Sequence, residues 1–342
     1  MLYLGTSFAD ATLYGNIDQT YNSTKTTAAG VVTNQKTNIS AYQQGQSFLG
    51  VKGGEDLGGG LKANYLYEFG LATDTTAAPT NRQSFVGLSG GFGAVRIGKQ
   101  YSQAFMNSLA ADPGSATGGR GALYLFGLAS YDATGSILTG ITGGEQPLRQ
   151  DKSIQYDLPN FVPGLKLGIT KVFGNANTAN NGAKVGDGTG FNASYTSGGL
   201  YAGFTTDSNK GKGILENLGI YDAADTETNK LTTLALSYDL GMAKPSYQNT
   251  KISVGTATWK TDMFAVSVPL GAATVFLSSS TGKMDLAGTA DDIKAKGMQY
   301  GVNYALSKRT VAYWHAGNDT LTANDGAVIK TTGFGIGVHH SF

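Results

Sequence analysis

The sequence predicts an all-β fold, a 16-stranded antiparallel β-barrel that spans a membrane. Three observations predict it. Stretches of about ten residues alternate between apolar and polar side chains, as transmembrane barrel strands do. Short and long connectors follow one another in turn along the chain. The composition, with 50 Gly among 342 residues, disfavours helices, because each glycine costs a helix about 1 kcal/mol relative to alanine.

The final strand of the chain shows the clearest alternation. Within residues 332–342, large side chains occupy the even positions from 334 onward, and the odd positions hold glycine, histidine or serine. Successive side chains of a strand point to opposite faces, so one face is apolar and the other is nearly open. Lipid can cover the apolar face while water wets the other. The large side chains are Phe334, Ile336, Val338, His340 and Phe342.

The same two-faced pattern recurs along the whole chain. Residues 61–70 and 298–307 are the clearest further examples, because tyrosine, phenylalanine and leucine alternate there with polar or small residues. Weaker examples span residues 13–21, 48–52, 191–195, 234–240 and 264–270.

The connectors between these strands are of two kinds, which alternate. The seven short ones span residues 55–60, 89–93, 160–164, 197–199, 240–244, 269–272 and 307–308. The eight longer ones are rich in Thr, Asn, Asp and Gly, and span residues 26–38, 73–80, 103–145, 174–188, 209–228, 251–256, 281–295 and 318–330. Together they join 16 strands, with turns on one rim and loops on the other, as in an outer-membrane barrel.

Composition and charge exclude several other classes of protein. The chain has no Cys, which excludes disulfides, thiolate metal sites and thiol nucleophiles. Its net charge is +1, without the basic excess of a nucleic-acid binder, so we expect no nucleic-acid partner. No stretch approaches the roughly 18 consecutive apolar residues of a membrane helix, but barrel strands escape that test because their apolar residues alternate.

A soluble two-sheet sandwich is the alternative fold, because its strands also alternate. It predicts connectors of mixed length at both ends and no girdle of tyrosines near the strand ends, so the connectors favour the barrel. We expect one domain over residues 10–342. Residues 1–9 end like the small-x-small site of a secretory leader and are interpreted as a possible signal-peptide remnant, with an ordinary disordered start as the alternative.

Six segments of the chain resemble the trimeric general porins of Gram-negative bacteria, most of all the beta-proteobacterial and neisserial type. Similarity runs in the same order from residue 10 to the last residue, and the loops between the segments are the unmatched parts. The matching segments are ATLYG at 11–15, LGVKGGEDL at 49–57, NRQSFVGLSGGFG at 81–93, DLPNF at 157–161, YALSKRT at 304–310 and VHHSF at 338–342.

The resemblance implies a sixteen-stranded barrel, three per assembly, each with a water-filled pore that a long third loop narrows by folding inward. Members of the family end in Phe, which the outer-membrane assembly machinery reads, and Phe342 matches that position. The implied surroundings are a lipid bilayer with lipopolysaccharide, and the implied assembly is a homotrimer.

The basic side of the constriction is expected to come from strands. In the resembled family, arginines of the wall face acidic groups on the inward loop, and Arg82 matches one of these arginines. Arg149 shares the alternation of Ser153 and should face the lumen with it. Lys52 and Arg96 have lumen parity in their strands and add positive potential, which the low-dielectric walls of a pore focus.

Phe48 departs from the family pattern, because relatives commonly carry Arg before Leu-Gly at this position. The departure puts a strong anion preference in doubt. By alternation, Phe48 places a ring in the pore wall, on the side opposite Leu49.

The acidic side of the constriction is expected on the third loop, near residues 103–145, which is the longest connector. A long loop in a compact domain is usually functional. Asp112 is the first candidate and Glu145 the second.

The residues that an enzyme or a metal site would need are scarce. A hydrolase needs a base beside its nucleophile, and the three histidines, His315, His339 and His340, all lie in the last two expected strands. Adjacent His339 and His340 point to opposite faces of a strand and cannot share one metal ion. Three acidic residues in one loop suggest calcium, but their spacing follows no calcium-loop motif, so a solvated polar loop is expected: Asp222, Asp225 and Glu227.

Together these inferences predict a passive diffusion channel of the bacterial outer membrane for ions and small hydrophilic solutes, with no cofactor, no metal and no enzymatic activity. A plugged surface barrel that acts mainly as an adhesin or antigen is the alternative. A barrel enzyme such as a phospholipase is a third reading, and it would require His315.

Overall fold

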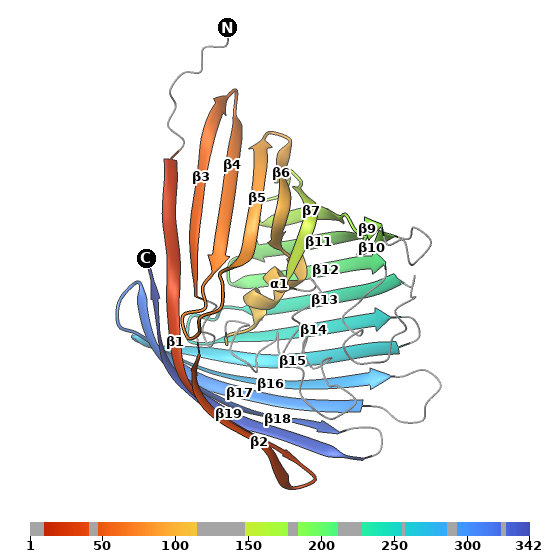
Figure 1. Ribbon diagram of the computed structural model, residues 1–342. Helices are drawn as coiled ribbons and strands as arrows, with labels where there is room; N and C mark the ends of the chain where they lie inside the picture. The colour runs from red at the N-terminus through yellow and green to blue at the C-terminus, as the bar shows by residue number, and fades with distance from the viewer. Residues whose placement is uncertain are drawn as a thin grey trace.

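The computed structural model describes residues 10–40, 47–114, 148–176, 184–210, 228–254, 257–285, 293–322 and 326–342. One ring of antiparallel strands makes up the molecule in Figure 1. The strands in front and the strands behind cross steeply in this view, as the tilted strands of a barrel do.

Each long strand pairs with its neighbours in the chain, and β1 also pairs with β19, which closes the ring. The strands are β1 (Asp10–Ala28), β2 (Val31–Ser40), β3 (Phe48–Gly58), β4 (Leu61–Gly70), β5 (Thr80–Gly90), β6 (Gly93–Tyr101), β7 (Arg149–Asp157), β8 (Leu165–Val172), β9 (Asn175–Ala176), β10 (Lys184–Val185), β11 (Gly188–Ser197), β12 (Leu200–Lys210), β13 (Thr228–Tyr238), β14 (Lys244–Val254), β15 (Ala257–Leu270), β16 (Ala273–Asp285), β17 (Ile293–Ala305), β18 (Thr310–Thr322) and β19 (Val328–Ser341), and the helix is α1 (Gln103–Ala111).

The barrel has 16 strands when β2 and β3 are counted as one. Both pair with β1: β2 with residues 20–28 and β3 with residues 10–16. The two therefore occupy one position in the ring, and residues 41–46 between them lie outside the described part. The short strands β9 and β10 form a separate hairpin between β8 and β11. The predicted fold class is confirmed.

Turns and loops lie on opposite rims, as the alternation of connectors predicted. All seven short connectors fall between paired strands, from the β3–β4 turn to the β17–β18 turn. The predicted loop at residues 26–38 is wrong. There β1 and β2 continue as a ladder to a two-residue turn at Ala29 and Gly30, both with positive φ, as a two-residue hairpin turn requires.

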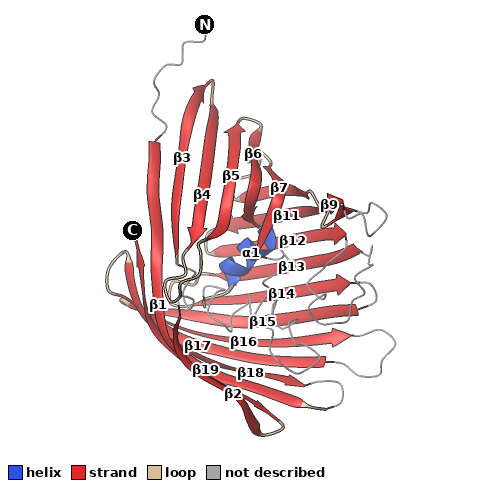
Figure 2. Cartoon of the chain, in the orientation of Figure 1, coloured by secondary structure: helices blue, strands red, loops and turns tan. Residues whose placement is uncertain are grey.

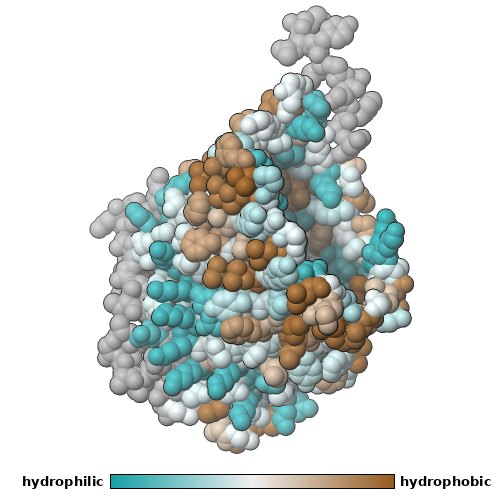
Figure 3. All heavy atoms as spheres, turned by 180° about the vertical axis from the view of Figure 1, so that it is seen from behind, coloured by the Kyte–Doolittle hydropathy of each residue, from teal (hydrophilic) through white to brown (hydrophobic). Residues whose placement is uncertain are grey.

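The two faces of the barrel wall differ in character. On β13, the inner side chains of Asn229, Thr233 and Ser237 are buried, while Leu234 and Tyr238 are exposed on the outside. In the final strand the even positions face outward, and Phe342 is 42% exposed. Figure 3 shows hydrophobic side chains gathered in patches over the outer face of one side. Within the described residues, no helix is long and apolar enough to cross a membrane.

The barrel closes where the first strand, β1, pairs with the last strand, β19. Gly15 and Phe342 exchange two backbone hydrogen bonds, of 3.2 and 3.0 Å. The ring of Phe342 covers Gly15, because a Cβ at Gly15 would lie 2.8 Å from that ring. On the inner side, the buried carboxylate of Asp18 accepts a 2.7 Å hydrogen bond from Tyr313 and lies 3.3 Å from the ring of His339.

Candidate functional site

The third loop begins with α1, which lies inside the ring of strands (Figure 2). The helix begins directly after β6 because Ser102 caps it: the Ser102 hydroxyl accepts a hydrogen bond from the backbone N–H of Phe105. It ends at Ala111, where the N–H of Asp112 donates to the Ser108 carbonyl. The helix has nine residues and is therefore about 14 Å long.

The second half of α1 is held by inward-facing side chains of β14. Gln248 donates to the Ser108 hydroxyl at 3.1 Å, and Ser246 donates to the carbonyl of Ala111 at 2.5 Å. Beyond the helix the chain continues across the lumen to β17, since a Cβ at Gly114 would lie 2.7 Å from the Gln299 side-chain oxygen. Residues 102–114 thus run through the interior, and the prediction of an inward-folded third loop is confirmed for this part.

Arg82 is the most deeply buried of the predicted basic residues near the start of α1. Its side chain forms an ion pair with Glu68 of β4 at 3.3 Å, and only 6% of the residue is exposed. Glu68 also accepts hydrogen bonds from Tyr14 at 2.8 Å and from Gln83 at 3.1 Å. Arg82 further donates to the hydroxyl of Tyr101, the residue that precedes the helix cap. Arg82 is therefore paired within the wall and linked to the root of the third loop.

Phe48 lies in the same cluster, on the inner face, as alternation predicted. The guanidinium of Arg82 lies 4.6 Å from the centre of the Phe48 ring, and Tyr14 meets that ring edge-on at 5.6 Å. Lys52 joins through Tyr14, with its ammonium 4.5 Å from the Tyr14 ring centre. A cation over an aromatic face is attracted by the negative charge of the π-system.

Arg149 reaches the same cluster by a route that alternation did not predict. The register of β6 and β7 shifts between Gly98 and Gln100, where Lys152 has a positive φ of 47°. This bulge interrupts the alternation on which the prediction rested. The Arg149 guanidinium lies 5.0 Å from the Tyr101 ring centre, and Nη2 lies 3.5 Å from the Tyr101 hydroxyl. Tyr101 thus brings Arg82 and Arg149 together.

Arg96 lies in a second group, nearer the turn rim. It donates to Asp157 at 2.7 Å and to the side chain of Gln155 at 3.2 Å. The same Gln155 oxygen accepts a hydrogen bond from Gln103, in the first turn of α1, at 3.3 Å. Arg96 is therefore separated from the helix by one glutamine.

The two acidic candidates of the third loop have different outcomes. Asp112 follows the helix and is buried, and its carboxylate accepts a 2.8 Å hydrogen bond from the N–H of Gly114. It lies at the opposite end of α1 from Tyr101 and the arginines. Glu145 lies outside the described residues.

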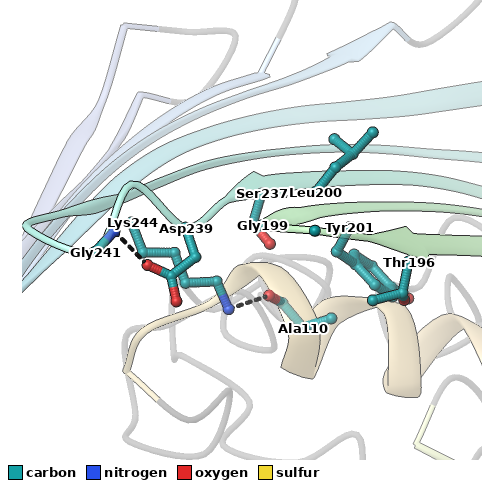
Figure 4. Close-up of a pocket in the computed structure, with 10 residues that line it drawn as sticks. Ala110, Thr196, Gly199, Leu200, Tyr201, Ser237, Asp239, Gly241 and Lys244 are labelled. Carbon is teal, nitrogen blue, oxygen red and sulfur yellow. Dashed lines mark hydrogen bonds between the residues drawn. The ribbon is translucent and has the colours of Figure 1, made fainter.

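A pocket of about 610 Å³ separates the end of α1 from the turn rim (Figure 4). Ala110 of the helix lines one side, and Tyr201, Ser237, Asp239 and Lys244 line the other. The ammonium of Lys244 approaches the Ala110 carbonyl at 3.5 Å. The end of the helix thus leaves a cavity against the wall formed by β11 to β14.

The histidines lie as the pattern suggested. His339 faces the lumen beside Asp18, and His340 accepts or donates a 2.9 Å hydrogen bond with Thr310 at the turn rim. His315 is buried on the inner face, 2.8 Å from the Asn303 side chain. Among the described residues, no group of three or more potential metal ligands gathers. The three acidic residues at 222–227, for which a solvated polar loop was expected, lie outside the described part.

Sequence reasoning did not single out the partners of these basic residues. Glu68 has lumen parity in its strand, and Asp157 and Gln155 share the parity of Ser153, so alternation could have found them. Tyr101 could not have been found in this way, because it lies beyond the register shift between β6 and β7.

Comparisons with known proteins agree with the fold. Residues 4–324 match the family described as Gram-negative porin. Outer membrane porin protein 32 of Delftia acidovorans is 28% identical over 318 residues, which is 89% of this chain and 82% of that protein. Major outer membrane protein P.IB of Neisseria meningitidis serogroup B is 26% identical over 348 residues, covering 98% of this chain and 95% of the other.

Among solved structures, the anion-selective porin from Comamonas acidovorans has a TM-score of 0.79 and 26% identity, and covers 98% of this chain and 100% of its own. OmpF of Salmonella typhi is 14% identical with a TM-score of 0.70 over 98% of each chain, which shows a shared fold. The closed barrel, the inward loop and these similarities together show that the chain belongs to the Gram-negative porins, the non-enzymatic outer-membrane channels through which ions and small solutes diffuse.

Proposed function

We propose that this porin is a weakly selective diffusion channel whose narrowest part lies beside α1. The observation that carries the proposal is the pairing of wall arginines with wall carboxylates: Arg82 with Glu68 and Arg96 with Asp157. A paired arginine contributes little net charge to the field that a passing ion meets. Width, set by the helix, then selects solutes more strongly than charge does.

Within this proposal, the basic side of the constriction consists of Arg82, Arg149, Lys52 and Arg96, and Asp112 supplies the acidic side. The basic cluster and Asp112 lie at opposite ends of a helix about 14 Å long, which sets up a field along α1. Glu145 is a second acidic candidate. The paired arginines and the Phe48 ring give this lumen less net positive charge than four free cations would.

A solved relative is described as anion-selective, and this chain is proposed to differ from it through Phe48. Phe48→Arg is expected to add one unpaired positive charge to the wall and to raise anion permeability roughly threefold, which moves the ratio of anion to cation permeability toward anions. The estimate takes about 0.6 kcal/mol for unit charges roughly 7 Å apart in water. Reversal potentials in a salt gradient measure the ratio. Phe48→Leu, which removes the ring without adding charge, is the control and should leave the ratio near that of the wild type.

Assembly is proposed to follow the family. Three copies form the channel unit in a bilayer with lipopolysaccharide, and Phe342 at the end of the closing strand serves as the signal that the assembly machinery reads. Residues 1–9 are proposed to be what remains of the secretory leader. Unheated gel electrophoresis of the purified protein tests the trimer, which should migrate at three times the mass of the chain.

Planar-bilayer recording of the purified protein tests the channel itself. Stepwise conductance increases with a reversal potential close to zero in a salt gradient are expected. A barrel that inserts and gives no steps would favour the plugged adhesin or antigen, and liposome swelling with small sugars would then separate the two. A strong ion preference would contradict weak selectivity while leaving the channel intact.

A further inference from the structure

The middle of α1 is attached to the barrel wall by one amide side chain. Asn107 is 5% exposed, and its amide nitrogen donates to the hydroxyl of Thr205 on β12 at 2.6 Å and to that of Thr233 on β13 at 3.5 Å. Its amide oxygen accepts a 2.7 Å hydrogen bond from the hydroxyl of Tyr201. Both ends of the amide are thus held by wall residues of two neighbouring strands.

The wall provides space for this amide at Gly203. A Cβ added to Gly203 would lie 2.5 Å from the Asn107 amide oxygen and 2.6 Å from the Tyr201 hydroxyl. Real Cβ atoms do not approach other atoms so closely, so a side chain at position 203 would displace the amide. The absence of a side chain at Gly203 therefore leaves a space, here called the Gly203 socket, that the Asn107 amide fills. Any larger residue at position 203 would occupy this space.

Asn107 makes three side-chain hydrogen bonds to the wall, whereas Gln103 and Ser108 of the same helix make one each. Its neighbour Met106 is 44% exposed, and the helix carries no charged side chain that could pair with the wall. Leaving a buried amide without partners is costly, so the hydrogen-bonded position is strongly preferred over a displaced one. The polar contacts of Asn107 therefore fix the distance of the helix from β12 and β13.

We infer that Asn107 is the positioning residue of the constriction: docked in the Gly203 socket, it holds α1 at one distance from the wall and so sets the width of the pore. The inference rests on the proposed placement of the narrow part beside α1. The residue itself need not touch a passing solute. It acts through the helix, whose exposed side carries Met106.

Single-channel recording with Asn107→Ala and Tyr201→Phe tests the inference. Asn107→Ala removes all three hydrogen bonds, and Tyr201→Phe removes only one while keeping the ring. One lost hydrogen bond should raise the population of displaced helix positions about fivefold, and loss of several should raise it at least tenfold. These positions appear as subconductance steps and open-channel noise. Met106→Ala, on the exposed side of the same helix, should stay as quiet as the wild type.

A second pair of variants tests the socket. Gly203→Ala should give the same noise as Asn107→Ala, because the added methyl group displaces the amide. In the background of Asn107→Ala, the same methyl group meets only the Tyr201 hydroxyl, which has then lost its amide partner and can move aside, so no further noise is expected. Gly297→Ala is the matched control, because its added Cβ would meet the flexible Ser280 hydroxyl at 2.8 Å on a strand distant from Asn107.

The outcomes separate this inference from the channel proposal. If wild-type protein forms no channels, the proposed function fails and the noise experiment has no signal. If wild-type channels form and both Asn107→Ala and Tyr201→Phe are as quiet as Met106→Ala, with unchanged sugar cut-off in liposome swelling, the positioning role is wrong. Unheated gel mobility of each variant checks folding, and a noisy channel with normal mobility supports the role.

Discussion

Replacing Arg82 with alanine is expected to shift the channel toward cations. In the wild type, Arg82 and Glu68 form a pair with little net charge. The substitution leaves the Glu68 carboxylate without its arginine, next to Tyr14 and Gln83, which donate hydrogen bonds but carry no charge. One net negative charge about 7 Å from a passing ion is worth about 0.6 kcal/mol in water, which corresponds to a roughly threefold higher cation permeability. Reversal potentials in a salt gradient measure this shift, and low salt enlarges it.

The complementary change, Glu68→Gln, should move the ratio the other way, because it leaves Arg82 with its full positive charge. The double variant, Arg82→Ala with Glu68→Gln, restores a neutral wall and should return close to the wild-type ratio. Two single variants that both leave the reversal potential unchanged would place this pair outside the narrow part of the pore.

The largest effect on stability is expected from Gly98→Ala. Gly98 has a φ of +142°, and an added Cβ would lie 2.1 Å from the Ser84 carbonyl oxygen on the neighbouring strand. A residue with a side chain must therefore abandon this backbone conformation and push β5 away from β6. We expect a loss of about 2 to 4 kcal/mol of folding free energy, the scale of a forced backbone distortion with a steric clash. Urea titration of the refolded barrel in detergent, followed by unheated gel mobility, measures it.

The control for this variant is Gly91→Ala, in the turn between the same two strands. Nothing lies within 4 Å of a Cβ at Gly91. Its midpoint should match the wild type within the error of the titration. Equal stability of Gly98→Ala and Gly91→Ala would show that position 98 of β6 tolerates a residue with a side chain.

Alternation of side chains was enough to predict the wall of this barrel. It placed Phe48, Lys52 and Arg96 on the inner face, because strand geometry fixes the direction of every second side chain. The turns were predicted from a different signal, because short connectors that contain Gly and Ser allow only a tight reversal of the chain. The clearest error, the predicted loop at residues 26–38, arose because Thr and Asn are frequent in loops but here pair across an extended ladder. The predicted loops at residues 251–256, 281–295 and 318–330 are also strand in part.

Contacts within the site could not be predicted from the sequence wherever the strand pairing is irregular. Bulges shift the faces of β5 and of β7, so the meeting of Arg82 and Arg149 at Tyr101 is a product of two register shifts that no period reveals. The docking of Asn107 was hidden for another reason. Its partners lie roughly a hundred residues later in the chain, and a nine-residue helix without charged side chains carries no pattern that identifies the strands on which it rests.

The tight turn at Ala29 and Gly30 makes the first hairpin a suitable site for a peptide tag that can be detected on intact cells. A Cβ at Gly30 meets nothing within 4 Å, and the turn belongs to the rim that carries the long connectors, the side that porins expose to the medium. A short peptide tag inserted there would extend away from the channel without changing the shape of the constriction. Antibody staining of intact bacteria would then measure, for each cell, how much of the protein is inserted with this rim facing outward.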